Sequence, residues 1–419
     1  MALFKLYYFL PFFLISGPFL SDLLVSLTSL FFLYYFFKYE KKFILNKFSY
    51  FFILFYFFLL FVALFSVDNI FSFKSTIPYF RFFLFGFIIW FCLEKKILNL
   101  KVFYLILLFI ISIFFLDSLF QYFLGSNIFG QVSPLKYRIT SFFGDEAIMG
   151  SFIFKIYLLF SFIDLLIKIK YQKVIFIIVT LFSCILIVIS GDRTPFYLTF
   201  IYFMLISFLS KTKKIHFWSI FIFLIVSCIF IFSNDIIKNR LVKMTYSGFF
   251  TTLEKFDQDK IDSEIDVNIK ENKNLKYFIS DDHHSHFLSA KKIFLNNFLL
   301  GSGPNTFRLE CQKKDYFIKE NSCSTHPHNF YLQIASETGI VGLIVFLFIF
   351  LYSFFKILKI IIFDKEDFRL ALIYIYIFLI FFPLSPNGNF FNNWLSILNY
   401  LPLGFFLYYN NNKNYFFSK

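Results

Sequence analysis

The sequence predicts an all-α, polytopic integral membrane protein with about 12 transmembrane helices and one large outer loop. Three observations lead to this fold class. Of the 419 residues, 59% are hydrophobic, and apolar runs of about 20 residues, long enough to cross a bilayer, recur through most of the chain. Lysine-rich gaps between the runs alternate with gaps of little net positive charge. Only one gap is long enough to form a sizeable soluble element.

The apolar runs, taken in order, predict the individual spans. The first run contains one lysine, as a signal peptide would, but no small-x-small cleavage site follows it, so we interpret it as a retained first helix. The expected spans lie at residues 4–17, 20–37, 49–67, 76–93, 102–121, 149–167, 174–190, 195–210, 216–233, 328–352, 368–384 and 392–409.

The charges between the runs predict the orientation. By the positive-inside rule, the gaps that hold Lys38, Lys95, Lys168, Lys211 and Lys356 face the cytoplasm, and both termini lie inside. The opposite gaps, at residues 68–74, 117–150, 191–194, 234–327 and 386–393, then face outward. Residues 234–327 hold 14 basic and 13 acidic residues, so the net charge of +14 lies almost entirely elsewhere. Membrane orientation explains the basic balance, and we expect no nucleic-acid partner.

This pattern divides the chain into nine helices at 1–233, an outer loop domain at 234–327 and three helices at 328–419. An acidic run within the loop lacks the central glycine and terminal glutamate of a calcium-binding loop, so we interpret it as solvated. The run 281-DDHHSH-286 lacks the ligand spacing of a zinc site, and we interpret it as a polar turn before a helix. The acidic run contains Asp257, Asp259, Asp262, Glu264 and Asp266. The sequence thus predicts no metal and no cofactor.

Two cysteines lie in the outer loop, twelve positions apart. In an oxidising compartment, Cys311 and Cys323 could form a disulfide that closes a short loop. The alternative is a pair of free thiols, because spacing alone does not determine a bridge.

The segment 326-HPHNFYLQIASETGIVG-342 carries polar residues at the start of an apolar run. Pro327 suits the first position of a helix, which places His328 in the first turn. Asn329, Gln333 and Glu337 follow at intervals of four and form one polar stripe, which must face protein or water. The helix N-terminus favours a neutral imidazole and a nearby anion. The simpler alternative is that His326 and His328 only cap a helix.

Arginine is scarce, and five arginines map to the outward half of the protein. A forked, permanently charged guanidinium suits a diphosphate, which it can hold with two hydrogen bonds. Each one alone could equally be a snorkelling or salt-bridged residue, but several on one side beside a histidine favour a binding site. The five are Arg81, Arg138, Arg193, Arg240 and Arg308.

Together these motifs resemble those of the O-antigen ligase and polymerase superfamily. The 326–342 segment is similar to its His-Asn-x-x-Leu start followed by Glu-x-Gly-x-x-Gly. The segment 300-LGSGPNTFRLEC-311 resembles its Gly-x-Gly-Pro-Asn-x-Phe element, and 190-SGDRT-194 resembles its Ser-x-x-Arg-Thr turn. These motifs occupy residues 190–342, while the resemblance in topology extends over residues 1–409.

The resemblance implies a GT-C-like membrane glycosyltransferase that is metal-independent and inverting. Such an enzyme, in the bacterial inner membrane with its site facing the periplasm, moves a glycan from an undecaprenyl-diphosphate carrier to lipid A-core. The resemblance places His328 in the position of the essential histidine, with His326 as the alternative. It places Arg193 and Arg240 in the positions of the arginines that hold the diphosphate. Asn329, Gln333, Glu337, Arg81, Arg138 and Arg308 would support the site.

Two other functions remain open. An O-antigen polymerase would use a similar donor but extend another lipid-linked chain. A transporter of lipid-linked sugars would more often show internal repeats or glycine- and proline-interrupted helices in matching halves, and the sequence has neither.

Overall fold

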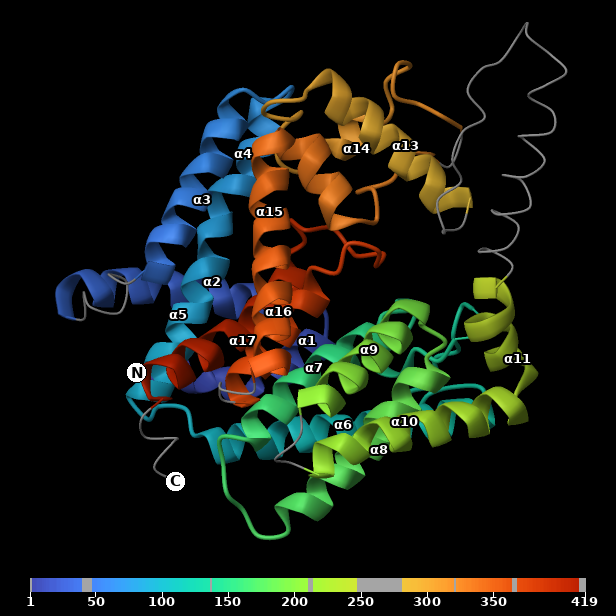
Figure 1. Cartoon of the computed structure of the whole chain (residues 1–419). Helices are drawn as coiled ribbons and strands as arrows, with labels where there is room; N and C mark the ends of the chain where they lie inside the picture. The colour runs from blue at the N-terminus through green and yellow to red at the C-terminus, as the bar shows by residue number, and fades with distance from the viewer. Residues whose placement is uncertain are drawn as a thin grey trace, which may run out of the picture.

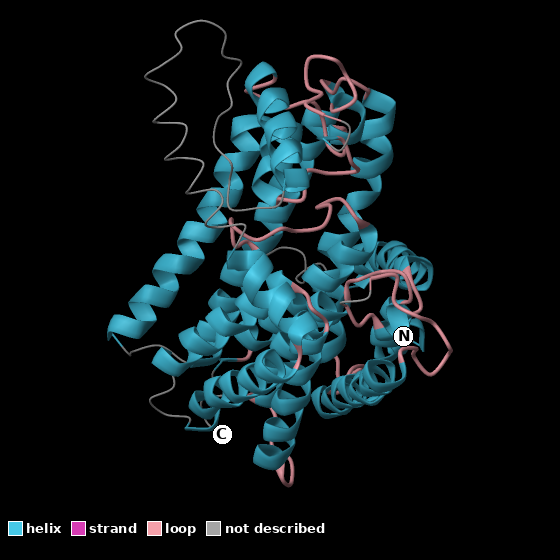
Figure 2. Cartoon of the chain, turned by 90° about the vertical axis from the view of Figure 1, so that its right-hand side faces the viewer, coloured by secondary structure: helices cyan, strands magenta, loops and turns pink. Residues whose placement is uncertain are grey.

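The computed structural model describes residues 2–39, 47–135, 138–209, 214–246, 281–319, 322–363 and 368–413. In these ranges the regular structure is helical, and the one β-bridge pairs Ser126 with Val132. Figure 2 shows the helices and the loops that connect them. The acidic run at residues 257–266 lies outside the described ranges.

Each of the twelve expected spans coincides with a helix. The helices are η1 with α1 (Ala2–Phe9, Leu10–Ile15), α2 (Pro18–Tyr39), α3 (Lys47–Leu64), α5 (Phe80–Glu94), α6 (Leu100–Leu124), α7 (Met149–Asp164), α8 (Gln172–Ile189), α9 (Arg193–Leu209), α10 (Lys214–Ser233), α15 (Phe330–Phe363), α16 (Phe368–Ile380) and α17 (Asn393–Asn411). Shorter elements are α4 (Asn69–Thr76), η3 (Ile77–Tyr79), η4 (Ser141–Phe143), α11 (Asp235–Lys238), η5 (Asn239–Lys243), α13 (Asp281–Asn296) and α14 (Phe307–Glu310).

Six of the described helical segments are long and apolar enough to cross a membrane, and four further apolar helices are shorter. The outer surface is correspondingly apolar, with side chains such as Phe232 and Phe123 exposed by 81% and 75%. A water-soluble protein rarely exposes so many large apolar groups, whereas a bilayer accommodates them. The polytopic membrane character is therefore supported, while the count of twelve spans stays a prediction.

Two of the predicted outer gaps are partly helical in the structure. The gap at 68–74 is a helix, α4, because the Asp68 side chain accepts a hydrogen bond from the Phe71 N–H and caps it. Helix α6 continues past Asp117 to Leu124 and ends at Gly125, whose φ of 85° suits a helix C-terminus. The buried Asp117 carboxylate then accepts from the Ile128 N–H and the Ser141 hydroxyl of the following loop.

Helices from distant parts of the chain enclose one continuous apolar core. Helix α17 packs against α5 and α2, and α15 packs against α16. In Figure 1, α6 to α10 form a second group beside them, and α13 and α14 lie at the top of the view, over the start of α15. This arrangement places parts of the 234–327 segment on the helix that carries the polar stripe.

Candidate active site

The start of helix α15 differs from the prediction in one detail. The helix begins at Phe330, and the Asn329 side chain caps it by accepting hydrogen bonds from the N–H groups of Tyr331 and Leu332. An asparagine oxygen satisfies these donors, which Pro327 cannot do, so the helix starts three residues later than predicted. His328 consequently lies just before the helix, in the left-handed region with φ of 56°.

The polar stripe is present and is buried within the protein. The Gln333 amide donates to the Glu337 carboxylate at 3.1 Å and to the Asn389 side chain at 2.7 Å, and its oxygen accepts from the Phe390 N–H. The Asn329 amide donates to the Pro383 carbonyl. The stripe therefore attaches the loop between α16 and α17 to helix α15.

Helix α15 is kinked at Gly339, and the backbone of the 300–311 segment packs against the kink. Gly339 has φ of 68° and ψ of −165°, outside the helical region. The Ser302 and Gly303 N–H groups donate to the Ser336 and Glu337 carbonyls, and the Ile340 N–H donates to the Phe298 carbonyl. A Cβ on Gly301 would lie 2.3 Å from the Glu337 carbonyl carbon. The segments 300–311 and 326–342, which carry the two glycine-containing motifs, thus contact each other through their backbones.

Glu337 also positions an arginine. Its fully buried carboxylate accepts hydrogen bonds from the backbone N–H groups of Asn305, at 3.0 Å, and Phe307, at 2.9 Å. The Asn305 side-chain oxygen in turn accepts from Arg308 at 3.0 Å and from Asn389. The polar stripe therefore holds the segment that carries the Arg308 guanidinium.

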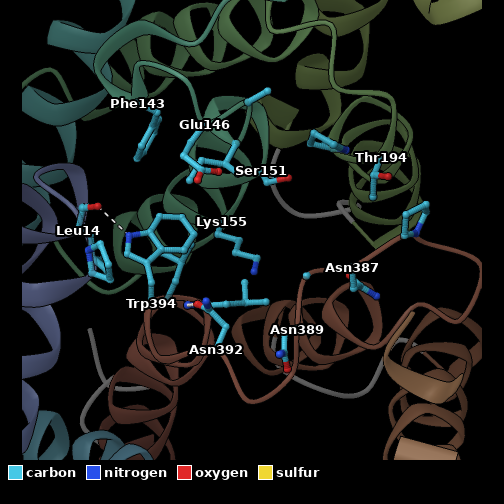
Figure 3. Close-up of a pocket in the computed structure, with 18 of the residues that line it drawn as sticks. Leu14, Phe143, Glu146, Ser151, Lys155, Thr194, Asn387, Asn389, Asn392 and Trp394 are labelled. Atoms are coloured by element: carbon cyan, nitrogen blue, oxygen red, sulfur yellow. Dashed lines mark hydrogen bonds between the residues drawn. The ribbon is translucent and has the colours of Figure 1, made fainter. Parts of the chain in front are cut away.

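A cavity of about 1190 Å³ lies where these segments meet (Figure 3). Its lining comes from α1, the 131–148 loop, α7, the start of α9, the loop before α15 and the 386–395 segment. Two arginines and one lysine line it, Arg138, Arg308 and Lys155, as do two acidic residues, Asp145 and Glu146. The volume exceeds that of a typical small-molecule pocket and is sufficient for a large, partly charged substrate.

His326 and His328, from the 326–342 segment, both line the cavity, but their imidazoles have different surroundings. The His326 ring is held at both nitrogens, by the Thr325 hydroxyl at 2.9 Å and the Asn387 carbonyl at 3.3 Å. Because a carbonyl can only accept, Nε2 carries the proton and Nδ1 accepts from Thr325. The His328 nitrogens have no hydrogen-bond partner within the described part of the chain. His328 is therefore the histidine whose lone pair is available.

Both imidazoles are kept neutral near pH 7. Burial, followed by the neighbouring His326, His283 and His286, lowers the pKa of His328 to about 3. Burial is also the main cause that lowers the pKa of His326 to about 4. The neutral state that was expected from a helix N-terminus thus has desolvation as its main cause.

Lys155 is a cavity residue that sequence reasoning missed. It lies on α7 with its side chain half-buried, and its amine donates to the Asn399 side chain at 2.7 Å. In Figure 3 this side chain extends between the α7 and α17 sides of the cavity. A lone lysine within an apolar run is a signal of function that the sequence did contain.

The predicted arginines are distributed between the cavity and its surroundings. Arg138 lines the cavity and pairs with the Asp192 carboxylate. Arg193 begins α9 next to the lining residue Thr194, and the Arg240 guanidinium donates to the Gly191 carbonyl at 3.4 Å, so both belong to the adjacent turn. Arg81 is not among the lining residues, because it pairs with Asp22 at 2.8 Å between α5 and α2.

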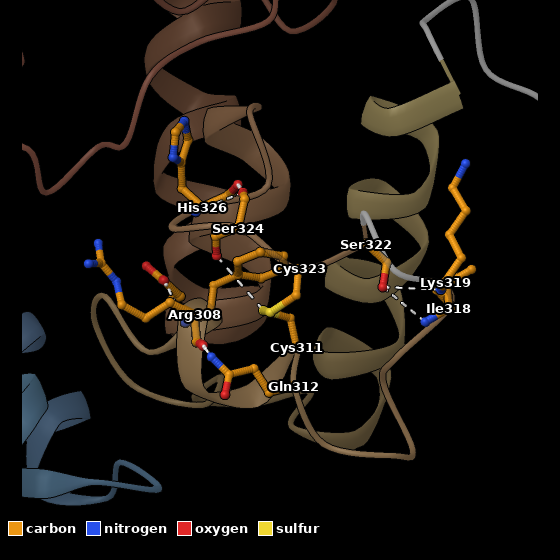
Figure 4. Close-up of a disulfide and its surroundings, with 11 residues drawn as sticks. Arg308, Cys311, Gln312, Ile318, Lys319, Ser322, Cys323, Ser324 and His326 are labelled. Carbon is orange, nitrogen blue, oxygen red and sulfur yellow. Dashed lines mark hydrogen bonds between the residues drawn. A yellow bond between two sulfur atoms is a disulfide. The ribbon is translucent and has the colours of Figure 1, made fainter.

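Cys311 and Cys323 form a disulfide, with Cα atoms 5.2 Å apart (Figure 4). The bond joins the end of α14, which carries Arg308, to the segment that leads to His326. Around it, Ala290, Ile293 and Phe307 form a small apolar cluster separate from the main core. The disulfide thus links the segment that carries Arg308 to the segment that carries His326.

The run 281-DDHHSH-286 is helical, which corrects its interpretation as a turn before a helix. It forms the first turns of α13, so His283 and His286, three positions apart, share one helix face. Their ligand nitrogens and that of His328 all lie within 4.8 Å of one another. Sequence spacing could not predict this group, because its third member is 42 positions from His286 in the chain.

The fold and the cavity define a class of protein: a polytopic helical membrane protein with a polar cavity that is lined by arginine, lysine and a histidine that precedes one helix. Residues 178–347 match the family model described as O-Antigen ligase. This match, which covers less than half of the chain, supports the expected resemblance to the O-antigen ligase and polymerase superfamily, whose members are glycosyltransferase-like enzymes. No curated protein and no solved structure matches the chain.

Proposed function

We propose that the protein is an O-antigen ligase that moves a glycan from undecaprenyl diphosphate to lipid A-core on the periplasmic face of the inner membrane. One observation carries the proposal: the unengaged His328 imidazole lines the same cavity as Arg308 and Lys155. This arrangement lies largely within the segment that matches the ligase family. A neutral base beside fixed positive charges is what glycosyl transfer from a diphosphate requires.

In the proposed reaction, the acceptor hydroxyl oxygen attacks the anomeric carbon of the donor glycan. The new carbon–oxygen bond forms as the bond from the anomeric carbon to the diphosphate oxygen breaks on the opposite face, so the configuration inverts. His328 accepts the hydroxyl proton, and undecaprenyl diphosphate leaves with the bonding electron pair. General-base catalysis of this kind contributes about 100- to 10,000-fold. His326, which is engaged at both nitrogens, orients the neighbouring ring.

The leaving diphosphate gains negative charge, which fixed cations stabilise without a metal ion. Arg308 and Lys155 are the cavity cations that we assign to it, with Arg138 supporting them from its pair with Asp192. We retain Arg193 and Arg240 as diphosphate-binding residues at the adjacent turn, where Thr194 reaches the cavity. Glu337, Gln333 and Asn329 act by positioning.

A polymerase remains the second candidate, because the matched family supports both reactions. The two differ in what a deletion strain accumulates. Loss of a ligase leaves lipopolysaccharide with core alone, whereas loss of a polymerase leaves core that carries one repeat unit. Gel electrophoresis of lipopolysaccharide from the deletion strain distinguishes them, and core with normal long chains would contradict both proposals.

A further inference from the structure

Three histidines from two separate segments converge at the edge of the cavity. His283 and His286 come from the first turns of α13, and His328 comes from the turn before α15. The ring centroids of His283 and His286 lie 4.9 and 5.2 Å from that of His328. One nitrogen of each imidazole lies within 4.8 Å of the other two.

His286 provides a second, independent observation. Its side chain is only 7% exposed, and its Nδ1 has no hydrogen-bond partner in the described part of the chain. A buried polar atom without a partner is costly and uncommon in a folded protein. Its ring nevertheless faces the two other histidines, so a ligand shared by all three would satisfy this nitrogen.

The donor set selects a class of ligand. Imidazole nitrogen binds zinc, copper, nickel and cobalt, whereas magnesium and calcium take oxygen ligands. Zinc–nitrogen bonds of about 2.0–2.1 Å place tetrahedral ligand nitrogens roughly 3.4 Å apart. The present nitrogens lie within 4.8 Å of one another, so side-chain rotations must shorten each spacing by no more than about 1.4 Å. His326 does not supply the fourth ligand, because both of its nitrogens are engaged.

We propose that His283, His286 and His328 bind one divalent transition-metal ion of the zinc class, with the fourth coordination position open. The metal takes no part in glycosyl transfer. It occupies the lone pair of His328 and so inhibits the enzyme, a consequence that rests on the proposed function. Metal binding itself rests only on the three imidazoles.

The experiment is a titration of the full-length protein with Co²⁺, followed by visible absorption of the bound ion. The protein is purified in detergent with a tag that contains no histidine. We expect one Co²⁺ per chain and its displacement by Zn²⁺. His286→Gln weakens the affinity by more than about tenfold, since even loss of an outer-shell partner of a metal ligand costs 10- to 100-fold. The control is His284→Gln, which changes the residue next to His283 on α13. His284 is outside the group, so this variant binds Co²⁺ as the wild type does.

Absence of saturable binding, or equal binding by wild type and His286→Gln, overturns the proposed site. Thermal unfolding of both variants establishes that they are folded. A second assay separates this proposal from the proposed function: Zn²⁺ inhibits transfer by the wild type more strongly than by His286→Gln. If bound Zn²⁺ leaves transfer unchanged, inhibition is overturned while the site stands. If no transfer occurs under any condition, the proposed function fails and the Co²⁺ result is unaffected.

Discussion

At the scale of single residues, the site depends on which polar atoms are already engaged. His326 and His328 are two positions apart and both line the cavity, but only His328 keeps an available nitrogen. Sequence alone assigned His328 through its place before Asn329. The structure adds a physical reason, because the Thr325 hydroxyl and the Asn387 carbonyl engage both nitrogens of His326, whereas the ring nitrogens of His328 have no such partner in the described ranges.

The first prediction concerns Glu337. Replacement by alanine removes the acceptor of the buried N–H group of Phe307 and of the partly buried N–H group of Asn305, at about 1–3 kcal/mol each. We expect Glu337→Ala to lower the free energy of unfolding by roughly 2–6 kcal/mol. Glu337→Gln keeps one acceptor oxygen and loses less. Thermal unfolding in detergent measures both, and equal stability of Glu337→Ala and wild type would disprove this positioning role.

The second prediction concerns Lys155. Lys155→Gln removes a half-buried amine from the cavity, while the glutamine amide can still donate to Asn399. If Lys155 stabilises the leaving diphosphate, the rate of transfer falls by about 100-fold, as for other fixed groups that stabilise developing charge. Steady-state transfer kinetics measure it. The matched control is Lys101→Gln, an exposed lysine at the start of α6, which leaves the rate unchanged.

At the scale of elements, apolar periodicity and run length located the helices well, and the ends were less predictable. The run that became α15 was recognised from its apolar residues, yet its start depended on the Asn329 cap. Helix α4 was missed because it is short and depends on one capping contact from Asp68. The group of His283, His286 and His328 was unpredictable, since α13 must pack on α15 before they meet.

The third prediction concerns the kink in α15. A Cβ on Gly339 would lie 2.2 Å from the Leu299 carbonyl oxygen, in a backbone conformation that L-residues rarely adopt. We expect Gly339→Ala to cost at least about 1–3 kcal/mol from backbone strain alone, and more from the clash. Gly125→Ala is the control, because it shares a positive φ but has no atom within 4 Å of the added Cβ. Unfolding midpoints no lower for Gly339→Ala than for Gly125→Ala would contradict this account.

At the scale of the whole molecule, the described helices support a polytopic membrane protein, and the alternation of charge predicts its orientation. The lysine-rich gaps could be found from sequence because they follow a rule about charge and position. Lys155 was overlooked for the opposite reason: it stands alone within an apolar run, and its role becomes visible only when α7, α9 and α17 enclose a cavity.

The fourth prediction tests this orientation. Fusions of alkaline phosphatase, which is active only outside the cytoplasm, are made after residues 192 and 388 in the expected outer gaps. They are compared with fusions after residues 97 and 169 in the expected inner gaps. We expect activity from the first pair and none from the second, with a fluorescent-protein reporter giving the reverse pattern. Phosphatase activity at residue 97 or 169 would contradict the twelve-span arrangement.

The central claim is that His328 accepts the proton of the acceptor hydroxyl. The most direct measurement is transfer of glycan from a lipid diphosphate donor by the purified protein in lipid vesicles, with His328→Ala beside His326→Ala. We predict that His328→Ala lowers the rate by at least about 100-fold while its thermal unfolding stays close to that of the wild type, and that His326→Ala loses less. A wild-type rate in His328→Ala, with loss in His326→Ala, would contradict the claim and assign the role two residues upstream.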